Sequence, residues 1–130
     1  MINEKPESIY DSLILKNPIP IILDSPDSHL RYLLAKKDRF LNYSLELKAD
    51  SNIKVSELIR IVKTEISKRN KIIFDKDIII HLENNIVPHL DIDVFSLYNM
   101  YKNPDDDILY LLINFENKKS LLSQIFYFFR

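Results

Sequence analysis

The chain contains no glycine among its 130 residues. Glycine adopts positive backbone φ angles at no steric penalty, and tight turns and helix ends often require such an angle. Here those positions must be taken by asparagine, by aspartate or by a strained residue of another type. The pair Asn84-Asn85 and the acidic run 105–107 therefore mark places where the chain is predicted to turn.

The composition is that of one globular domain without a charge bias. At 130 residues and 46% hydrophobic, the chain is long enough for one core and too short for two. Its 18 Lys and Arg against 19 Asp and Glu give no field that would recruit nucleic acid or an acidic membrane. The absence of cysteine excludes disulfides, thiolate nucleophiles and cysteine-ligated metals. With no leader-like or membrane-spanning run in the sequence, we expect a cytoplasmic protein.

Two strands are predicted in the first part of the chain. Pro20 excludes helix, and proline is tolerated at the start of a strand, so the apolar run 19–23 is predicted to be the first strand. Residues 43–49, YSLELKA, alternate apolar and polar side chains, which indicates a half-buried second strand. Between them, leucines at helical spacing favour a helical connection within 29–41.

The rest of the chain alternates helices with strands. Residues 55–69 carry aliphatic side chains on one helical face; these are Val55, Leu58, Ile59, Val62 and Ile66. Residues 77–83 are rich in β-branched side chains, which is typical of a strand. A second helix is predicted over 91–101, with Asp93 as its N-cap. Residues 108–115 are apolar on both faces, which predicts a strand at the centre of a sheet.

The predicted order is strand, strand, helix, strand, helix, strand. The first two strands can pair as a meander, and the helices supply the crossovers that parallel neighbours require. This order predicts an α+β fold of the ubiquitin-like β-grasp class, a mixed four-stranded sheet with packed helices. A split βαβ arrangement of the ferredoxin type is the alternative, because residues 29–41 offer the helix that it needs directly after the first strand.

Four stretches resemble the autophagy ubiquitin-like modifiers of the GABARAP type. NPIPIIL resembles the first strand of that family, and KVSELIRIVKTEI resembles its first core helix. IIIHLENNIVP resembles its strand-and-turn segment, and LYNMYKNPDDDILYLLINFEN resembles its final helix, acidic turn and last strand. They occur in the family's order and with compatible spacing. The resemblance implies a ubiquitin-like domain over 18–117, a short N-terminal helical extension over 1–17 and an apolar tail over 118–130.

The resemblance ends where the family carries its terminal Phe-Gly. That position falls near Lys119-Ser120, and the family's conjugation cascade activates the carboxylate of the glycine. We therefore expect an autophagy-related protein that acts without glycine-dependent lipidation. Association with autophagosomal membranes stays open.

The resemblance also implies a peptide-binding site. In this family an acidic, extended aromatic-x-x-aliphatic peptide adds itself as a strand beside the second strand and places its two anchors in pockets. Carried over residue by residue, the first pocket is lined by Pro20, Ile22, Lys48 and Ile108, and the second by Leu47, Ala49, Leu58 and Ile61. Lys48, Arg60 and Lys63 are expected to meet the acids that precede the aromatic anchor. For Ile22 and Leu58, an ordinary place in the core is an equal alternative.

The tail carries apolar residues at helical spacing; these are Leu121, Leu122, Ile125, Phe126, Phe128 and Phe129. Three roles stay open for it: packing on its own domain, occupying the peptide groove in cis, or contacting a partner or a membrane. Membrane contact is the weakest of the three. Arg130 is the sole charge after Lys119, and one short amphipathic segment binds a bilayer only marginally.

The sequence offers no catalytic or metal-binding constellation. His29, His81 and His89 lie too far apart for a pair of ligands on one helix. The acidic run 105–107 lacks the order of a calcium loop and its glycine. The serines have no paired base and no glycine-containing oxyanion turn. We therefore expect a binding protein without a cofactor, and not an enzyme.

Two other functions stay open. The chain could be a noncovalent version of the second autophagy modifier, which pairs with a scaffold protein of the conjugation machinery. It could also be a structural subunit of a larger assembly, with the tail as its anchor. A stable heteromer that motif peptides cannot displace would indicate the first. Copurification at fixed stoichiometry that is lost on deleting 120–130 would indicate the second.

Overall fold

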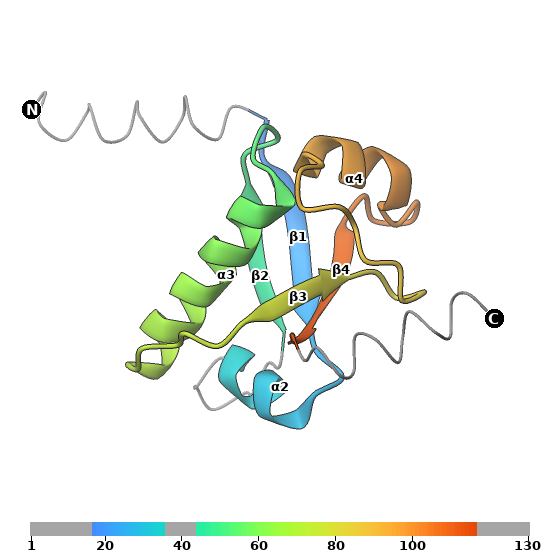
Figure 1. The fold of residues 1–130 in the computed structure, drawn as a ribbon. Helices are drawn as coiled ribbons and strands as arrows, with labels where there is room; N and C mark the ends of the chain where they lie inside the picture. The colour runs from blue at the N-terminus through green and yellow to red at the C-terminus, as the bar shows by residue number, and fades with distance from the viewer. Residues whose placement is uncertain (1–16, 36–43, 117–130) are drawn as a thin grey trace, which may run out of the picture.

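The computed structural model describes residues 17–35 and 44–116 (Figure 1). Within them the elements are β1 (Ile19–Asp24), α2 (Ser28–Leu34), β2 (Leu45–Ala49), α3 (Val55–Asn70), β3 (Ile78–His81), α4 (Val94–Tyr101) and β4 (Leu109–Phe115). The predicted N-terminal helix, the first residue of the predicted second strand (Tyr43) and the tail, with Leu121, Leu122, Ile125, Phe126 and Phe129, lie outside the described residues.

The strands form one mixed sheet in the order β2-β1-β4-β3. β1 pairs antiparallel with β2 and parallel with β4, and β3 pairs antiparallel with β4. This is the predicted β-grasp arrangement, with β4 in the interior of the sheet as its apolarity on both faces predicted. The split βαβ alternative is wrong although α2 does follow β1 directly. Its helix-linked strands run parallel and apart, whereas β1 and β2 are antiparallel neighbours.

Pro20 lies in β1, an interior strand, where proline is normally excluded because it cannot donate to the ladder. The pairing register explains why it is tolerated. Pro20 lies opposite Lys48 of β2, but the pairing of β1 with β4 begins one residue later, at Ile21 opposite Leu109. At Pro20 the strand is therefore still an edge on its β4 side, and the missing N–H removes no ladder bond there.

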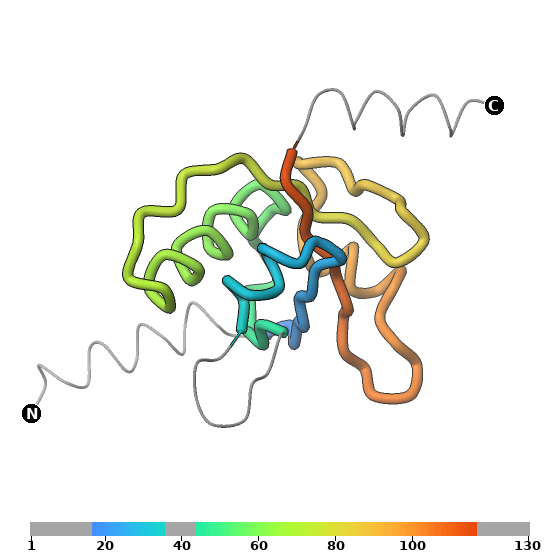
Figure 2. The backbone as a smooth tube through the Cα atoms, turned by 90° about the horizontal axis from the view of Figure 1, so that it is seen from below, coloured from blue at the N-terminus to red at the C-terminus, as the bar shows by residue number. Residues whose placement is uncertain are grey.

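The core lies between one face of the sheet and α3 (Figure 1). Alternate residues of β1, which are Ile19, Ile21 and Leu23, are buried, and those between them are half-buried on the other face. From α3 the side chains of Val55, Leu58, Val62 and Ile66 enter this core. Helix α2 lies at one end of the sheet, nearest the viewer in Figure 2. There the side chains of Arg69 and Asn70 of α3 donate to the carbonyls of Leu34 and Leu33.

The turns use the residues that a chain without glycine must use. Among the described residues, positive φ angles occur at Lys71 (53°), Asn85 (67°) and Asp107 (59°). Two of these are asparagine or aspartate, and Lys71 ends α3 in the left-handed conformation. The Asn84-Asn85 turn also ends β3 earlier than predicted, because the N–H of Leu82 already donates to the carbonyl of Ile86 at 2.8 Å.

Candidate functional site

β2 lies at one edge of the sheet. Among the described strands it pairs with β1 on its inner side and with none on its outer side. On that inner side Pro20 of β1 lies opposite Lys48, and Ile22 lies opposite Glu46. The outer side of an edge strand presents backbone N–H and C=O groups that can pair with a further strand. The position of β2 therefore meets the first requirement for binding an extended peptide by strand addition.

A cavity of about 380 Å³ lies beside this edge, a volume within the ~300–1,000 Å³ range of small-ligand pockets. It is lined by Pro20, Ile21, Ile22, Glu46, Leu47, Lys48 and Ile108, and we call it the β2 pocket. All four residues expected for the first pocket are among them. Pro20 and Ile22 reach it because they alternate along β1 with the buried residues and so point away from the core.

Ile108 is held in the β2 pocket by the acidic turn before β4. Its carbonyl accepts from the N–H of Asn103 at 2.9 Å, and its own N–H donates to a carboxylate oxygen of Asp106 at 3.0 Å. The hydroxyl of Tyr98, on α4, donates to the carbonyl of Asp107 at 2.8 Å. The acidic run thus has a structural role, because it holds Ile108 within the turn and joins that turn to α4.

The residues expected for the second pocket divide into two pairs. Ala49 and Leu58 are buried in the core, with Leu58 0% exposed. Leu47 is half-buried against that core, and Ile61 is 37% exposed on α3. Ala49 is buried because it lies on the same face of β2 as Leu45, which α3 covers. In this structure Leu47 and Ile61 alone can therefore present surface for an aliphatic anchor, with the other two beneath them.

The three basic residues expected to meet an acidic peptide do not gather in one place. Lys48 is exposed on β2 and lines the β2 pocket. Arg60 is exposed on α3, 3.9 Å from the carboxylate of Glu57. Lys63 instead lines a different cavity, beside β3. Ile59, which lies one helical turn before Lys63 and therefore on the same face of α3, lines that cavity too.

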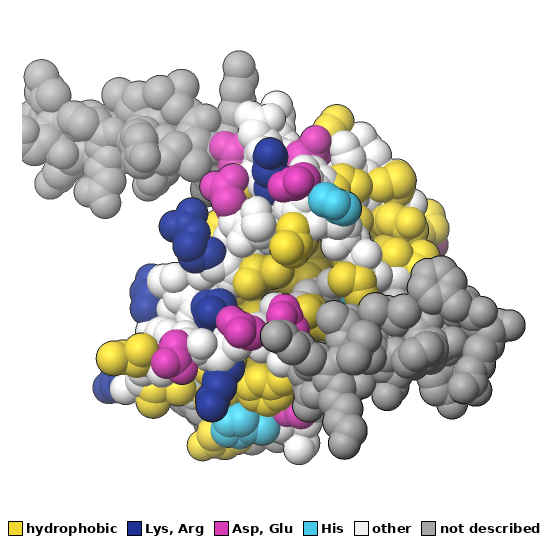
Figure 3. All heavy atoms as spheres, in the orientation of Figure 1, with side chains coloured by type: hydrophobic (Ala, Val, Ile, Leu, Met, Phe, Trp, Pro, Cys, Tyr) yellow, Lys and Arg dark blue, Asp and Glu magenta, His cyan; other side chains and the backbone are white. Residues whose placement is uncertain are grey.

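The cavity beside β3 was not expected from the sequence. It has a volume of about 370 Å³ and lies between α3, β3 and the loop that follows β3; we call it the β3 groove. It is lined by Val55, Ser56, Ile59, Lys63, Asp77, Ile78, Ile79, Ile80, Val87, Pro88, Leu90 and Glu116. Figure 3 shows apolar side chains over the middle of this face with charged side chains beside them. The available signal was apolar Val87 and Leu90 in the segment between the predicted strand 77–83 and the predicted helix 91–101.

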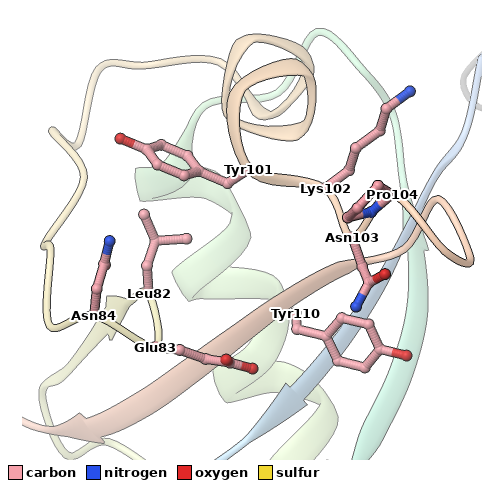
Figure 4. A pocket seen from close by; sticks show the side chains of 8 residues that line it. All are labelled: Leu82, Glu83, Asn84, Tyr101, Lys102, Asn103, Pro104 and Tyr110. Carbon is pink, nitrogen blue, oxygen red and sulfur yellow. The ribbon is translucent and has the colours of Figure 1, made fainter.

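A third, more polar cavity of about 320 Å³ lies between the turn after β3 and the end of α4 (Figure 4). At its wall the hydroxyl of Tyr110 donates to Asp106 at 2.5 Å, and this hydrogen bond raises the pKa of Tyr110. Lys102 points away from Glu83 and Tyr110 in Figure 4. It lies over the ring of Tyr98 and 3.7 Å from Asp107. Lys102 is therefore engaged outside the cavity and does not converge with Glu83 on it.

The histidines lie in separate surroundings. His81 is buried on β3, with its Nδ1 3.0 Å from the carbonyl of Leu82 and its Nε2 2.8 Å from the amide nitrogen of Asn114. His29 stacks on Phe115, and His89 is exposed beside Asp91. Within residues 17–35 and 44–116, no three side chains come together as metal ligands. No helix in these ranges has the length and apolarity needed to cross a bilayer.

The sequence matches no protein-family model and no curated protein. The structure does match solved structures. The crystal structure of Trypanosoma brucei ATG8 aligns with a TM-score of 0.54 at 13% sequence identity, over 88% of this chain and 86% of that one. The chain has the fold of an Atg8 protein. Plasmodium falciparum Atg8, in complex with a Plasmodium falciparum Atg3 peptide, aligns with a TM-score of 0.56 at 24% identity, over 86% of this chain and 87% of that one. The Atg8 fold is ubiquitin-like, so the fold predicted from the sequence is confirmed.

Proposed function

We propose that this chain is a non-catalytic, autophagy-related ubiquitin-like protein of the GABARAP type, which holds short acidic aromatic-x-x-aliphatic peptides of partner proteins on β2. One observation carries the proposal. The four residues that the sequence resemblance assigns to the first pocket line a single cavity, and that cavity lies beside an edge strand. The Atg8 fold supports it further, and one Atg8 of this fold is in complex with an Atg3 peptide.

In this proposal the peptide pairs its backbone with the outer side of β2, and its aromatic anchor enters the β2 pocket. Lys48 meets the acids that precede the aromatic residue, because it is exposed at the rim of that pocket. The aliphatic anchor rests on Leu47 and Ile61, above Ala49 and Leu58. Backbone pairing supplies affinity that does not depend on sequence, and the two contacts select the peptide.

The proposal does not include conjugation through a glycine, because none of the 130 residues is a glycine. The chain would act in the cytoplasm as a receptor and would reach autophagosomal membranes through its partners. Those partners are proteins that carry the motif, including components of the conjugation machinery.

The test is an NMR titration of the full chain with an acidic aromatic-x-x-aliphatic peptide. The matched control is the same peptide with both anchors replaced by alanine. We expect amide shifts centred on Ile22, Lys48 and Ile108 with the first peptide and none with the control. No shift with either peptide would refute the proposal and would direct attention to a constitutive protein partner. Shifts centred on the β3 groove would refute the assignment of the site.

A further inference from the structure

The β3 groove is an apolar surface of the described domain that the proposed peptide site does not use. Val87 is 43% exposed and Leu90 is 54% exposed, and both lie on the loop side of the groove. Half-buried Ile59 and Ile79 complete it from α3 and β3. Side chains of this kind, gathered around a cavity of about 370 Å³, lose water-exposed apolar area when another apolar segment covers them.

β3 is also the second edge of the sheet. Within the described residues, no backbone hydrogen bond joins Ile78, Ile79 or Ile80 to any segment other than β4. An open edge beside an apolar groove is a liability for a soluble protein unless another segment covers it. We therefore expect another segment to cover this edge and the groove.

The charged side chains at the rim indicate which charge a segment bound in the groove should carry. Asp77 and Glu116 line the end of the groove where β3 begins, and Lys63 lines it from α3. The N–H of Glu116 donates to the carbonyl of Asp77 at 2.8 Å, so both acids are fixed at this end. An acidic peptide of the kind proposed for β2 would bring like charge to this end. An apolar segment preceded by basic residues would bring opposite charge.

The residues that directly follow Glu116 have this composition. Lys118 and Lys119 follow Asn117, and residues 121–129, LLSQIFYFF, contain no charged side chain. Residues 117–120, when extended, span about 13 Å, which is about the length of the four residues of β3. The segment 121–129 can therefore begin anywhere along the groove without displacing β4.

We propose that residues 121–129 of the chain's own tail dock in cis in the β3 groove, with Lys118 and Lys119 beside Asp77 and Glu116. The helical spacing of the apolar tail residues suits an amphipathic segment laid with one face into a groove. Because β2 and β3 are opposite edges of the sheet, the docked tail leaves the β2 pocket open. The tail covers one edge, and a partner peptide uses the other.

The chain has no cysteine, which allows a direct test. A nitroxide spin label on the single cysteine of a Gln124→Cys variant, in the full chain, broadens amide NMR signals that lie near it. We expect loss of signal at Ile59, Ile79, Val87 and Leu90 and recovery when the label is reduced. Loss centred on Ile22 and Lys48 would place the tail in the β2 pocket and overturn the proposal. Absence of loss anywhere in residues 44–116 would overturn it too.

Two controls distinguish docking in cis from exchange of tails between chains and from nonspecific contact. In the first control, spin-labelled chain without isotope enrichment is mixed with isotope-enriched chain that carries no spin label. The groove signals of the enriched chain should then stay intact. Their loss would mean that a second copy supplies the tail and would overturn the proposal. In the labelled chain, Leu90→Glu should restore the groove signals, whereas Met100→Glu, at a similarly exposed residue (58%) on α4, should leave them broadened. If both variants restored the groove signals, or neither did, the proposal would also be overturned.

Discussion

The two edges of the sheet carry cavities of similar volume, about 380 Å³ beside β2 and about 370 Å³ beside β3, but different rims. The β2 pocket has exposed Lys48 and Glu46 of β2 at its rim and takes its apolar wall from β1 and from the turn before β4. The β3 groove has two acids at the end where β3 begins and Lys63 on α3, and it takes its apolar wall from α3, β3 and a loop. Similar edges and volumes thus do not imply similar ligands. The rim charges and the neighbouring segments distinguish an acidic peptide from a basic and apolar one.

The largest expected effect is a difference in stability between a core residue and a surface residue of α3, beneath the proposed peptide site. Leu58→Ala should lower the free energy of unfolding by about 2–5 kcal/mol, because Leu58 is fully buried and its loss leaves a cavity. Ile61→Ala should cost less than about 1 kcal/mol, because Ile61 is 37% exposed, yet it should weaken the binding of the motif peptide. Urea denaturation of both variants measures the difference. Equal losses of stability would show that Ile61 is also a core residue.

The next effect compares a cation at each edge. Lys48→Glu should weaken binding of the acidic motif peptide by about tenfold, since it replaces an attraction at the rim with a repulsion. Lys63→Glu, with the same charge change in the β3 groove, should leave that affinity unchanged. Calorimetric titration at low and high salt checks both, because the Lys48 effect should shrink as salt screens it. If the two variants weakened binding equally, the peptide would not distinguish the two edges.

A smaller effect concerns two left-handed turns, one at the end of α3 and one beside the β2 pocket. Lys71 precedes β3 with φ 53° and ψ 44°, so Lys71→Gly should raise the free energy of unfolding by up to about 1 kcal/mol. Asp107→Gly, in the turn beside the β2 pocket, should raise the free energy of unfolding by less. Aspartate tolerates this conformation better, and the substitution removes the ion pair with Lys102 at 3.7 Å. Thermal unfolding ranks the two, and a larger gain at Asp107 would contradict this ranking.

The smallest effect is a pH dependence at the start of α4, next to the loop of the β3 groove. The N–H of Ser96 donates to the side chain of Asp93 at 2.7 Å and lowers the pKa of Asp93. The stabilisation is therefore present above the unfolded pKa of about 3.9 and is lost as the pH falls through the lower folded value. Asp93→Asn keeps the acceptor but cannot titrate, so stability should fall less steeply below about pH 4 than in the wild type. Unfolding curves between pH 2 and 6 measure this, and parallel curves would contradict it.

Most of the fold could be predicted from the sequence because its signals are local. The aliphatic spacing of 55–69 indicated α3, and the apolarity of 108–115 indicated an interior strand. Asp93 was predicted as an N-cap from its position alone, and it caps α4. Helical and strand periodicity, capping and turn chemistry each depend on residues a few positions apart. Because the chain has no glycine, positive φ angles were expected at asparagine, at aspartate or at a strained residue, and they occur at Asn85, Asp107 and Lys71.

The candidate site was predicted less completely, because pockets are built from segments distant in sequence. Pro20, Ile22, Lys48 and Ile108 could be grouped only through the family resemblance, and it is the pairing of β1 with β2 and β4 that brings them to one cavity. Lys63 was expected beside β2 and lies beside β3. The side of α3 that a residue faces depends on how the helix crosses the sheet, which no local pattern specifies.

The sequence by itself determined the order and type of the main elements, the Asp93 cap of α4 and the turns at Asn84-Asn85 and 105–107, since short-range sterics and hydrogen bonding decide these. The tertiary structure alone decided that β2 and β3 are the two open edges. It also decided that Leu58 is buried while Ile61 is not, and that Val87, Lys63 and Glu116 meet around one groove. These properties follow from strand order and helix packing, which come from the burial of the whole core rather than from any single segment.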